Sequence, residues 1–197
     1  MTMNMQSAKE QSKQFQSRDF GFWLYLMTDA ILFSLLFATY VVMSRNVATG
    51  PPGHEIFDLT HTFGETLLLL FSSLTFGFAT LSLAAGRMTM VIGWLALTIL
   101  LGLGFVAMEI TEFQGMIAID AGPDKSGFLS AFFALVGTHG LHVSLGMVGI
   151  LVIIGQLLVK GPTDAVRSRF FRLGLFWHFL DIVWIGIFSV VYLPAVL

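Results

Sequence analysis

Five long apolar runs dominate the sequence and constrain its fold more than any other feature. Each run reaches the roughly 20 residues that an α-helix needs to cross the hydrocarbon core of a bilayer. Because lipid offers no hydrogen-bond partners, a spanning segment must satisfy its own backbone, as an α-helix does. We therefore predict an all-α membrane protein, a bundle of five transmembrane helices over Phe20–Met43, Thr62–Ala85, Met90–Ile110, Gly127–Leu158 and Phe170–Pro194.

The composition supports lipid as the solvent of this chain. Hydrophobic residues make up 56% of the sequence and charged residues only 11%, against about 25% charged in a typical soluble domain. The formal net charge of −2 indicates no basic surface for phosphates, so nucleic acid is not an expected partner. The chain has no cysteine, which excludes disulfides, thiolate metal sites, iron–sulfur clusters and covalent c-type haem.

The polar segments predict the orientation of the chain. Residues 1–19 lack the apolar core of a signal peptide, so we expect a disordered cytoplasmic tail ahead of a five-helix domain at 20–197. Turn-forming sequences separate the runs at Gly50–Gly53, Gly86–Arg87, Gly122–Asp124 and Gly161–Pro162. Basic residues concentrate in the tail and in the second and fourth connections. The positive-inside rule then places the N-terminus in the cytoplasm and the C-terminus in the periplasm.

Ionisable residues inside the runs or at their ends fall into two layers. Such residues cost about 3 kcal/mol or more near the bilayer centre, so each needs a partner or a function. One layer lies toward the cytoplasmic side and contains Asp29, His142, His178 and Asp181. The other lies near the outer face and contains His61, Glu65, Glu109 and Glu112.

The fourth run shows how a buried histidine is accommodated. Ser130, Ala134, Thr138, His142 and Gly146 recur every four residues and share one helix face. Small residues at this spacing allow close helix approach, so His142 is expected in a helix–helix contact. Gly174, His178 and Asp181 share a face of the fifth run in the same way. We hypothesise that Asp29 bonds His142 or His178, which a separation above about 6 Å from both would refute.

Two readings of these polar residues remain open. The spacings His139-x-x-His142 and His178-x-x-Asp181 allow metal or haem ligation. We favour hydrogen-bonded packing, because a haem needs opposed histidines and a zinc ion needs more ligands in one place. Asp29 is either a proton-relay carboxylate or a buried acid that fixes helix packing, and we favour the second. Glu109 and Glu112 fall at a membrane edge, where a solvated structural role is expected, and Glu65 lies somewhat deeper.

Five strings carry a family resemblance. In chain order they are GFWLYLMTDAILFSLLFATY from Gly21, ETLLLLFSSLT from Glu65, MEITEF from Met108, SGFLSAFFALVGTHGLHV from Ser126 and FWHFLDIVW from Phe176. They resemble subunit III of haem–copper terminal oxidases, and they extend through all five predicted helices. In detail they look most like the cytochrome bo-type ubiquinol oxidase subunit. The mitochondrial type has seven helices, of which this chain lacks the first two.

The resemblance implies a set of cofactors, partners and residue roles. Haems and copper would belong to subunit I, so no cofactor, catalytic residue or metal is expected on this chain. The family's bundle has a V-shaped cleft that holds phospholipid, and it packs beside subunit I, with subunit II and a small subunit IV. Asp29 aligns with a carbodiimide-reactive glutamate of the family, and Asp29, Glu65 and Glu109 are candidates for a proton-related or lipid-cleft role. Family motif positions imply structural roles for His139, His142, His178 and Asp181.

The expected function is therefore that of a non-catalytic subunit. We expect the chain to stabilise a proton-pumping ubiquinol oxidase and bind lipid in a bacterial inner membrane. One alternative is subunit III of a five-helix cytochrome c oxidase. Less favoured are a small proton or cation transporter using Asp29, Asp181 and Glu65, and a b-type cytochrome using His142 and His178. The sequence shows no internal repeat, which counts against the transporter.

Overall fold

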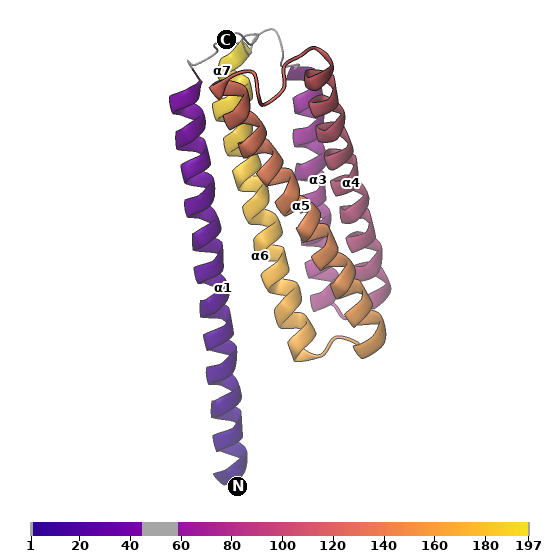
Figure 1. Cartoon of the computed structure of the whole chain (residues 1–197). Coiled ribbons are helices and arrows are strands. Elements are labelled where there is room, and N and C mark those ends of the chain that lie inside the picture. Colours follow the sequence, from indigo (N-terminus) through magenta and orange to yellow (C-terminus); the bar gives the residue numbers. More distant parts are fainter. Residues whose placement is uncertain (1, 45–58, 197) are drawn as a thin grey trace.

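The chain folds into long, roughly aligned helices (Figure 1). The computed structural model describes residues 2–44 and 59–196, and side chains within 19–44 and 59–194. The described elements are α1 (Thr2–Met43), α3 (Leu59–Ala84), α4 (Met88–Ala118), α5 (Gly127–Lys160), α6 (Asp164–Ile187), the π-helix η1 (Phe188–Tyr192) and α7 (Leu193–Val196).

Five of the described helices are long and apolar enough to cross a membrane, which confirms the five predicted spans. Large apolar side chains point away from the bundle on each of them. Examples are Ile31, Leu81, Leu100, Leu151 and Ile182, which are between 56% and 71% exposed. A soluble protein does not expose so much contiguous apolar surface, so these faces are those of a multi-pass membrane protein.

The helix ends extend beyond the predicted apolar runs. Helix α4 continues to Ala118 where an end at Ile110 was expected, and α6 begins at Asp164 where a start at Phe170 was expected. Hydropathy marks the limit of lipid contact, and a helix can continue past that limit with polar residues.

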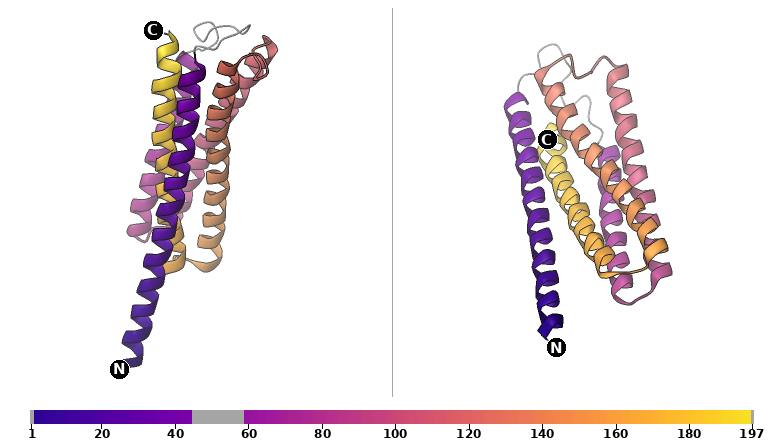
Figure 2. Two further views of the ribbon diagram at one scale, coloured as in Figure 1. Left: turned by 60° about the vertical axis from the view of Figure 1, so that its left-hand side comes forward. Right: turned by 60° about the horizontal axis from the view of Figure 1, so that its bottom comes forward.

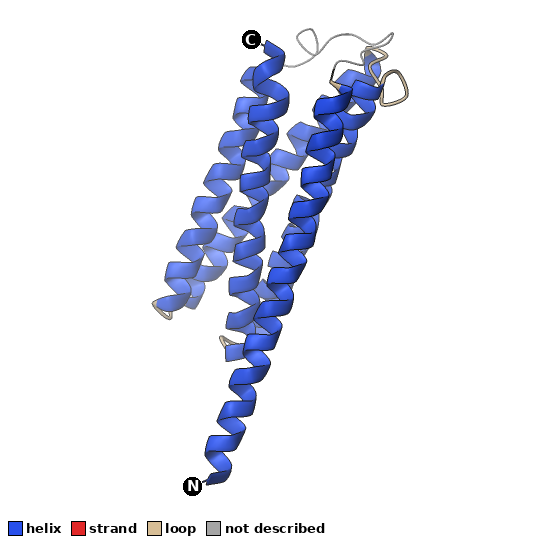
Figure 3. Cartoon of the chain, turned by 90° about the vertical axis from the view of Figure 1, so that its left-hand side faces the viewer, coloured by secondary structure: helices blue, strands red, loops and turns tan. Residues whose placement is uncertain are grey.

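The disordered tail is the larger correction. Residues 2–18 are helical and continue α1, which projects beyond the rest of the bundle in all views (Figures 1, 2 and 3). No glycine or proline occurs between Thr2 and Phe20, and the Gln, Lys, Glu, Met and Ala residues there favour helix.

Left-handed residues end two helices with the same hydrogen-bond pattern. After α3, Gly86 has φ +73°, its N–H bonds the Leu83 carbonyl, and the Arg87 N–H bonds the Ser82 carbonyl. This is a Schellman cap, which favours glycine because glycine has no Cβ. Asp120 has φ +62° and plays the same part after α4. The predicted turns at Gly122–Asp124 and Gly161–Pro162 also lie between helices, and Gly50–Gly53 lies outside the described residues.

The helices are packed so that α1 is peripheral. Helices α3 and α4 form an antiparallel hairpin, α5 packs against α4 and α6, and α1 packs against α5 and α6. The N-terminus, the α3–α4 turn and the α5–α6 turn lie at one end, and the C-terminus and the α4–α5 connection lie at the other (Figures 1 and 2). We call these the basic end and the outer end.

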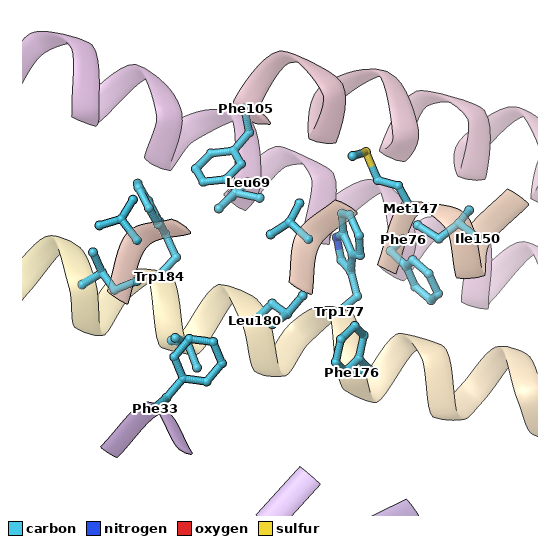
Figure 4. Packing of buried hydrophobic residues seen from close by; sticks show 14 of the residues in the cluster. Phe33, Leu69, Phe76, Phe105, Met147, Ile150, Phe176, Trp177, Leu180 and Trp184 are labelled. Carbon is cyan, nitrogen blue, oxygen red and sulfur yellow. The ribbon is translucent and has the colours of Figure 1, made fainter. Parts of the chain in front are cut away.

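Two tryptophans of α6 organise the core (Figure 4). The indole N–H of Trp177 donates to Ser72 Oγ at 3.1 Å, and that of Trp184 donates to Thr66 Oγ1 at 3.0 Å, both on α3. The Trp177 ring fits against Gly146 of α5, where an added Cβ would lie 2.9 Å from the ring. Each indole thus fills apolar volume while its polar N–H is satisfied across a helix interface.

Candidate functional site

The first polar site joins α1 to α5. Asp29 Oδ1 lies 3.9 Å from His142 Nε2, and the two side chains are 11% and 14% exposed. The sequence-based hypothesis required Asp29 to lie within about 6 Å of His142 or His178, and this distance meets that requirement with His142 as the partner. The separation exceeds a direct hydrogen bond, so the contact is an electrostatic one.

The hydrogen bonding of His142 defines what this pair can do. Its Nδ1 lies 2.7 Å from the Thr138 carbonyl oxygen, which only accepts, so Nδ1 carries a proton. Nε2 therefore faces Asp29 either as a bare acceptor or as the second N–H of a cation. The pair can hold one proton on the carboxyl group or on the ring, and the ring form makes it an ion pair.

The second polar site joins α6 to α3. His178 Nδ1 lies 2.5 Å from Ser73 Oγ. Asp181, one turn further along α6, is buried, and neither of its carboxylate oxygens has a hydrogen-bond partner among the described residues. The four groups predicted to share one layer therefore occupy two helix interfaces, α1–α5 and α3–α6. Ser73 is hydrogen-bonded to His178 only, so the prediction of a hydrogen-bonded Asp181 is wrong within the described residues.

His139 has a different environment from its neighbour His142. It is fully buried, with ring centroids 5.8 Å from Phe105, 5.2 Å from Trp184 and 6.3 Å from Phe33. Neither ring nitrogen has a hydrogen-bond partner in the part of the chain that the structure describes. Among the described residues, the prediction that His139 is hydrogen-bonded is therefore wrong. The helices packed around His139 present aromatic rings to it and no hydrogen-bonding groups.

An acidic cluster gathers at the outer end, as the sequence predicts. His61 Nδ1 and Glu65 Oε1 of α3 are 3.6 Å apart, and Glu112 Oε2 of α4 accepts a 3.0 Å hydrogen bond from Tyr192 of η1. One ligand atom each from His61, Glu65 and Glu112 all lie within 4.8 Å of one another. The i,i+4 spacing of His61 and Glu65 was the visible signal, whereas the approach of Tyr192 left none.

The expectation that Glu109 is solvated at a membrane edge is wrong. Glu109 is only 4% exposed, and its carboxyl group lies against the backbone of Gly140 on α5. Helix α4 continues well beyond Ile110, so Glu109 is not at a helix end, and the missing side chain of Gly140 leaves room for it. Glu65 is fully buried, deeper than its position in the sequence suggests.

A pocket that the sequence did not reveal lies at the basic end, between α1 and α6. Its volume is about 440 Å³. Arg172 closes one side by donating to Asp19 Oδ1 at 2.9 Å and to Ser168 Oγ at 2.6 Å. The remaining lining combines charged groups with an apolar floor: Phe22, Trp23, Asp164, Arg167, Phe171 and Leu175.

Comparison with known proteins decides the family. The family model described as cytochrome c oxidase subunit III matches residues 4–196, nearly the whole chain. The chain belongs to this family. The resemblance to subunit III of haem–copper terminal oxidases is thus confirmed.

Relatives in the subunit III family carry both quinol and cytochrome c names. Cytochrome bo(3) ubiquinol oxidase subunit 3 of Pseudomonas putida is 57% identical over 90% of this chain and 86% of its own length. Quinol oxidase subunit 3 of Bacillus subtilis (strain 168) is 43% identical over 88% and 85%. Cytochrome c oxidase subunit 3 of Bacillus sp. (strain PS3) is 39% identical over 88% and 84%.

Proposed function

We propose that this chain is subunit 3 of a ubiquinol oxidase. The observation that carries the proposal is the 57% identity, over 90% of this chain, to a protein named as that subunit. The complex would oxidise ubiquinol and reduce oxygen to water, and so contribute to the proton gradient. Haems and copper would reside in subunit I, and this chain would be a non-catalytic subunit that stabilises the assembly.

The charge distribution supports a placement in the bacterial inner membrane. Within the described residues, the basic end holds Arg87, Lys160, Arg167, Arg169 and Arg172, and Lys125 is the cation at the outer end. We therefore orient the basic end and the N-terminus toward the cytoplasm and the C-terminus toward the periplasm. The exposed apolar faces would contact lipid and the partner subunits I, II and IV.

The polar sites fit a structural role. Asp29–His142 ties peripheral α1 to α5, and Ser73–His178 ties α3 to α6. Pairing of this kind compensates the cost of polar groups in lipid and specifies which helix faces meet. The family position of Asp29 also supports a proton-related role for this pair.

The basic-end pocket supports phospholipid binding. Arg167 and Arg172 are suited to a lipid phosphate, and Phe22, Phe171 and Leu175 form an apolar surface for an acyl chain. The pocket lies where α1 meets α6, so a bound lipid would help to hold α1 on the bundle.

Purification of the native complex tests the function. An affinity-tagged chain, extracted in mild detergent, is expected to bring haem-bearing subunits with it and to oxidise ubiquinol. Oxidation of reduced cytochrome c without ubiquinol activity would instead support the cytochrome c oxidase alternative. A haem absorption band on the isolated chain would refute the non-catalytic role, and proton transport by that chain in liposomes would favour a transporter.

The lipid proposal is tested with two arginines of α6. Arg167→Gln removes a cation from the pocket lining, whereas the matched control Arg169→Gln removes an exposed cation that donates to Gln156 at 3.0 Å outside the pocket. We expect fewer phospholipids per complex by phosphorus analysis in Arg167→Gln only. Equal retention of lipid in both variants would contradict the proposed site.

A further inference from the structure

The outer acidic cluster has the composition of a metal site. We propose that His61, Glu65 and Glu112 bind one divalent transition-metal ion of the zinc type at the outer end of the bundle. One imidazole and two carboxylates form a ligand set that zinc accepts, with water in the remaining position. The inference is independent of which oxidase contains this subunit.

The geometry is already close to what such an ion requires. Two ligands at about 2.0–2.1 Å from a tetrahedral zinc ion lie about 3.3–3.4 Å apart. His61 Nδ1 and Glu65 Oε1 are 3.6 Å apart, so these two atoms need almost no adjustment. The remaining separations are no more than 4.8 Å, so these atoms have to approach one another by about 1.4 Å at most when an ion binds.

The burial of Glu65 independently points to a ligand. Its side chain is fully buried, and neither carboxylate oxygen has a hydrogen-bond partner among the described residues. A carboxyl group in this state is costly unless it is neutralised by a proton or a cation. The convergence of His61 and Glu112 on Glu65 favours the cation, because it brings a nitrogen ligand and a second carboxylate oxygen to the place where one ion would contact all three.

The surroundings supply the two other features of a metal site. Tyr192 donates to Glu112 Oε2 at 3.0 Å, which is the kind of outer hydrogen bond that orients a metal-binding carboxylate. The His61 side chain is 31% exposed, so the cluster is accessible to an ion from the outer side. A bound ion would link α3 directly to α4, and through Tyr192 to η1.

This site departs from the expectation that the chain binds no metal. That expectation rested on the family resemblance, which assigns haems and copper to subunit I, and on the lack of further ligands near the spaced histidine pairs. His61 and Glu65 are neighbours on one helix, but Glu112 joins them only because α3 and α4 pack as a hairpin and α4 extends beyond Ile110.

Zinc binding to the tag-free, full-length chain in detergent tests the proposal. After treatment with EDTA and dialysis, the chain is titrated with Zn²⁺ and the retained metal is measured by mass spectrometry. We expect one ion per chain and a higher melting temperature with zinc. His61→Ala and Glu65→Gln should each weaken binding by at least the roughly 10–100-fold that loss of an outer partner costs.

Asp124→Asn is the matched control, because it removes an exposed carboxylate from the connection at the same end. It should bind zinc as the unmodified chain does. If Glu65→Gln fails to fold, the zinc titration of His61→Ala tests the proposal. The His61 side chain is partly exposed, so its removal should destabilise the fold least among the three proposed ligands. Equal zinc retention by His61→Ala and the unmodified chain would overturn the proposal and leave protons as the neutralising species.

Discussion

The contact between Glu109 and Gly140 makes the sharpest prediction about this fold. An alanine at position 140 would place its Cβ 2.6 Å from the Glu109 carboxyl carbon and closer still to both oxygens. Ordinary contacts between heavy atoms lie at about 3.5–4.0 Å, so the carboxyl group would have to move by about 1 Å. Glu109 is only 4% exposed, so it has little free space to move into.

The magnitude follows from two opposing effects. Overpacking of this kind costs about 1–3 kcal/mol, and replacing glycine by alanine in a helix returns up to about 1 kcal/mol. Gly155→Ala is the matched control on the same helix, because an added Cβ there meets nothing within 4 Å. Gly140→Ala should therefore be about 1–3 kcal/mol less stable than Gly155→Ala.

A double-mutant cycle assigns the cost to the carboxyl group. The free energy of unfolding is measured by titrating SDS into mixed micelles and following tryptophan fluorescence. In a Glu109→Ala background the clash is absent, so Gly140→Ala should cost nothing there. Equal stability of Gly140→Ala and Gly155→Ala, or a cost that persists without Glu109, would refute the reasoning.

Two other contacts carry predictions of smaller size. Trp184→Phe removes the indole donor to Thr66, and its coupling to Thr66→Val in a double-mutant cycle should be about 0.6 kcal/mol, and no more than about 1.7. The loss of buried ring volume adds to the cost of the single variant but cancels in the cycle, and a coupling near zero would mean that the bond adds no stability. Lys125 donates to Asp120 at 2.7 Å, and this hydrogen bond raises the pKa of Lys125. The contact therefore stabilises the fold fully below the ordinary lysine pKa of about 10.4. This stabilisation is lost as the pH rises through the raised pKa of the folded state. The melting temperature of Lys125→Met should therefore be lower than that of the unmodified chain by a constant amount from neutral pH to about pH 9. This difference should shrink in stronger base, and a difference that grows in stronger base would contradict a stabilising contact between Lys125 and Asp120.

Some polar contacts were predictable because their signal is local. The four-residue recurrence of small residues around His142 indicated a close helix contact, and the structure places Asp29 3.9 Å away on α1. The sequence likewise placed His61 and Glu65 in one outer layer, and their i,i+4 spacing on α3 explains why the structure brings them together. Helix geometry alone determines which residues share a face, so such pairs are visible without a tertiary structure.

Other contacts had no local signal. The burial of Glu109 depends on Gly140 of another helix, and the aromatic environment of His139 depends on rings from α1, α4 and α6. Neither the contact of Glu109 with Gly140 nor the rings around His139 can be inferred from residue spacing. The rotation and relative height of packed helices are set by side chains that interlock across the interface.

The sequence by itself determined the number of spans, their helical form and the family, because lipid forces each apolar run to satisfy its own backbone and the motifs lie within those runs. The tertiary structure alone decided which buried acids and histidines meet. Lipid solvates every apolar face equally well, so hydropathy cannot distinguish the faces that pack from those that remain exposed.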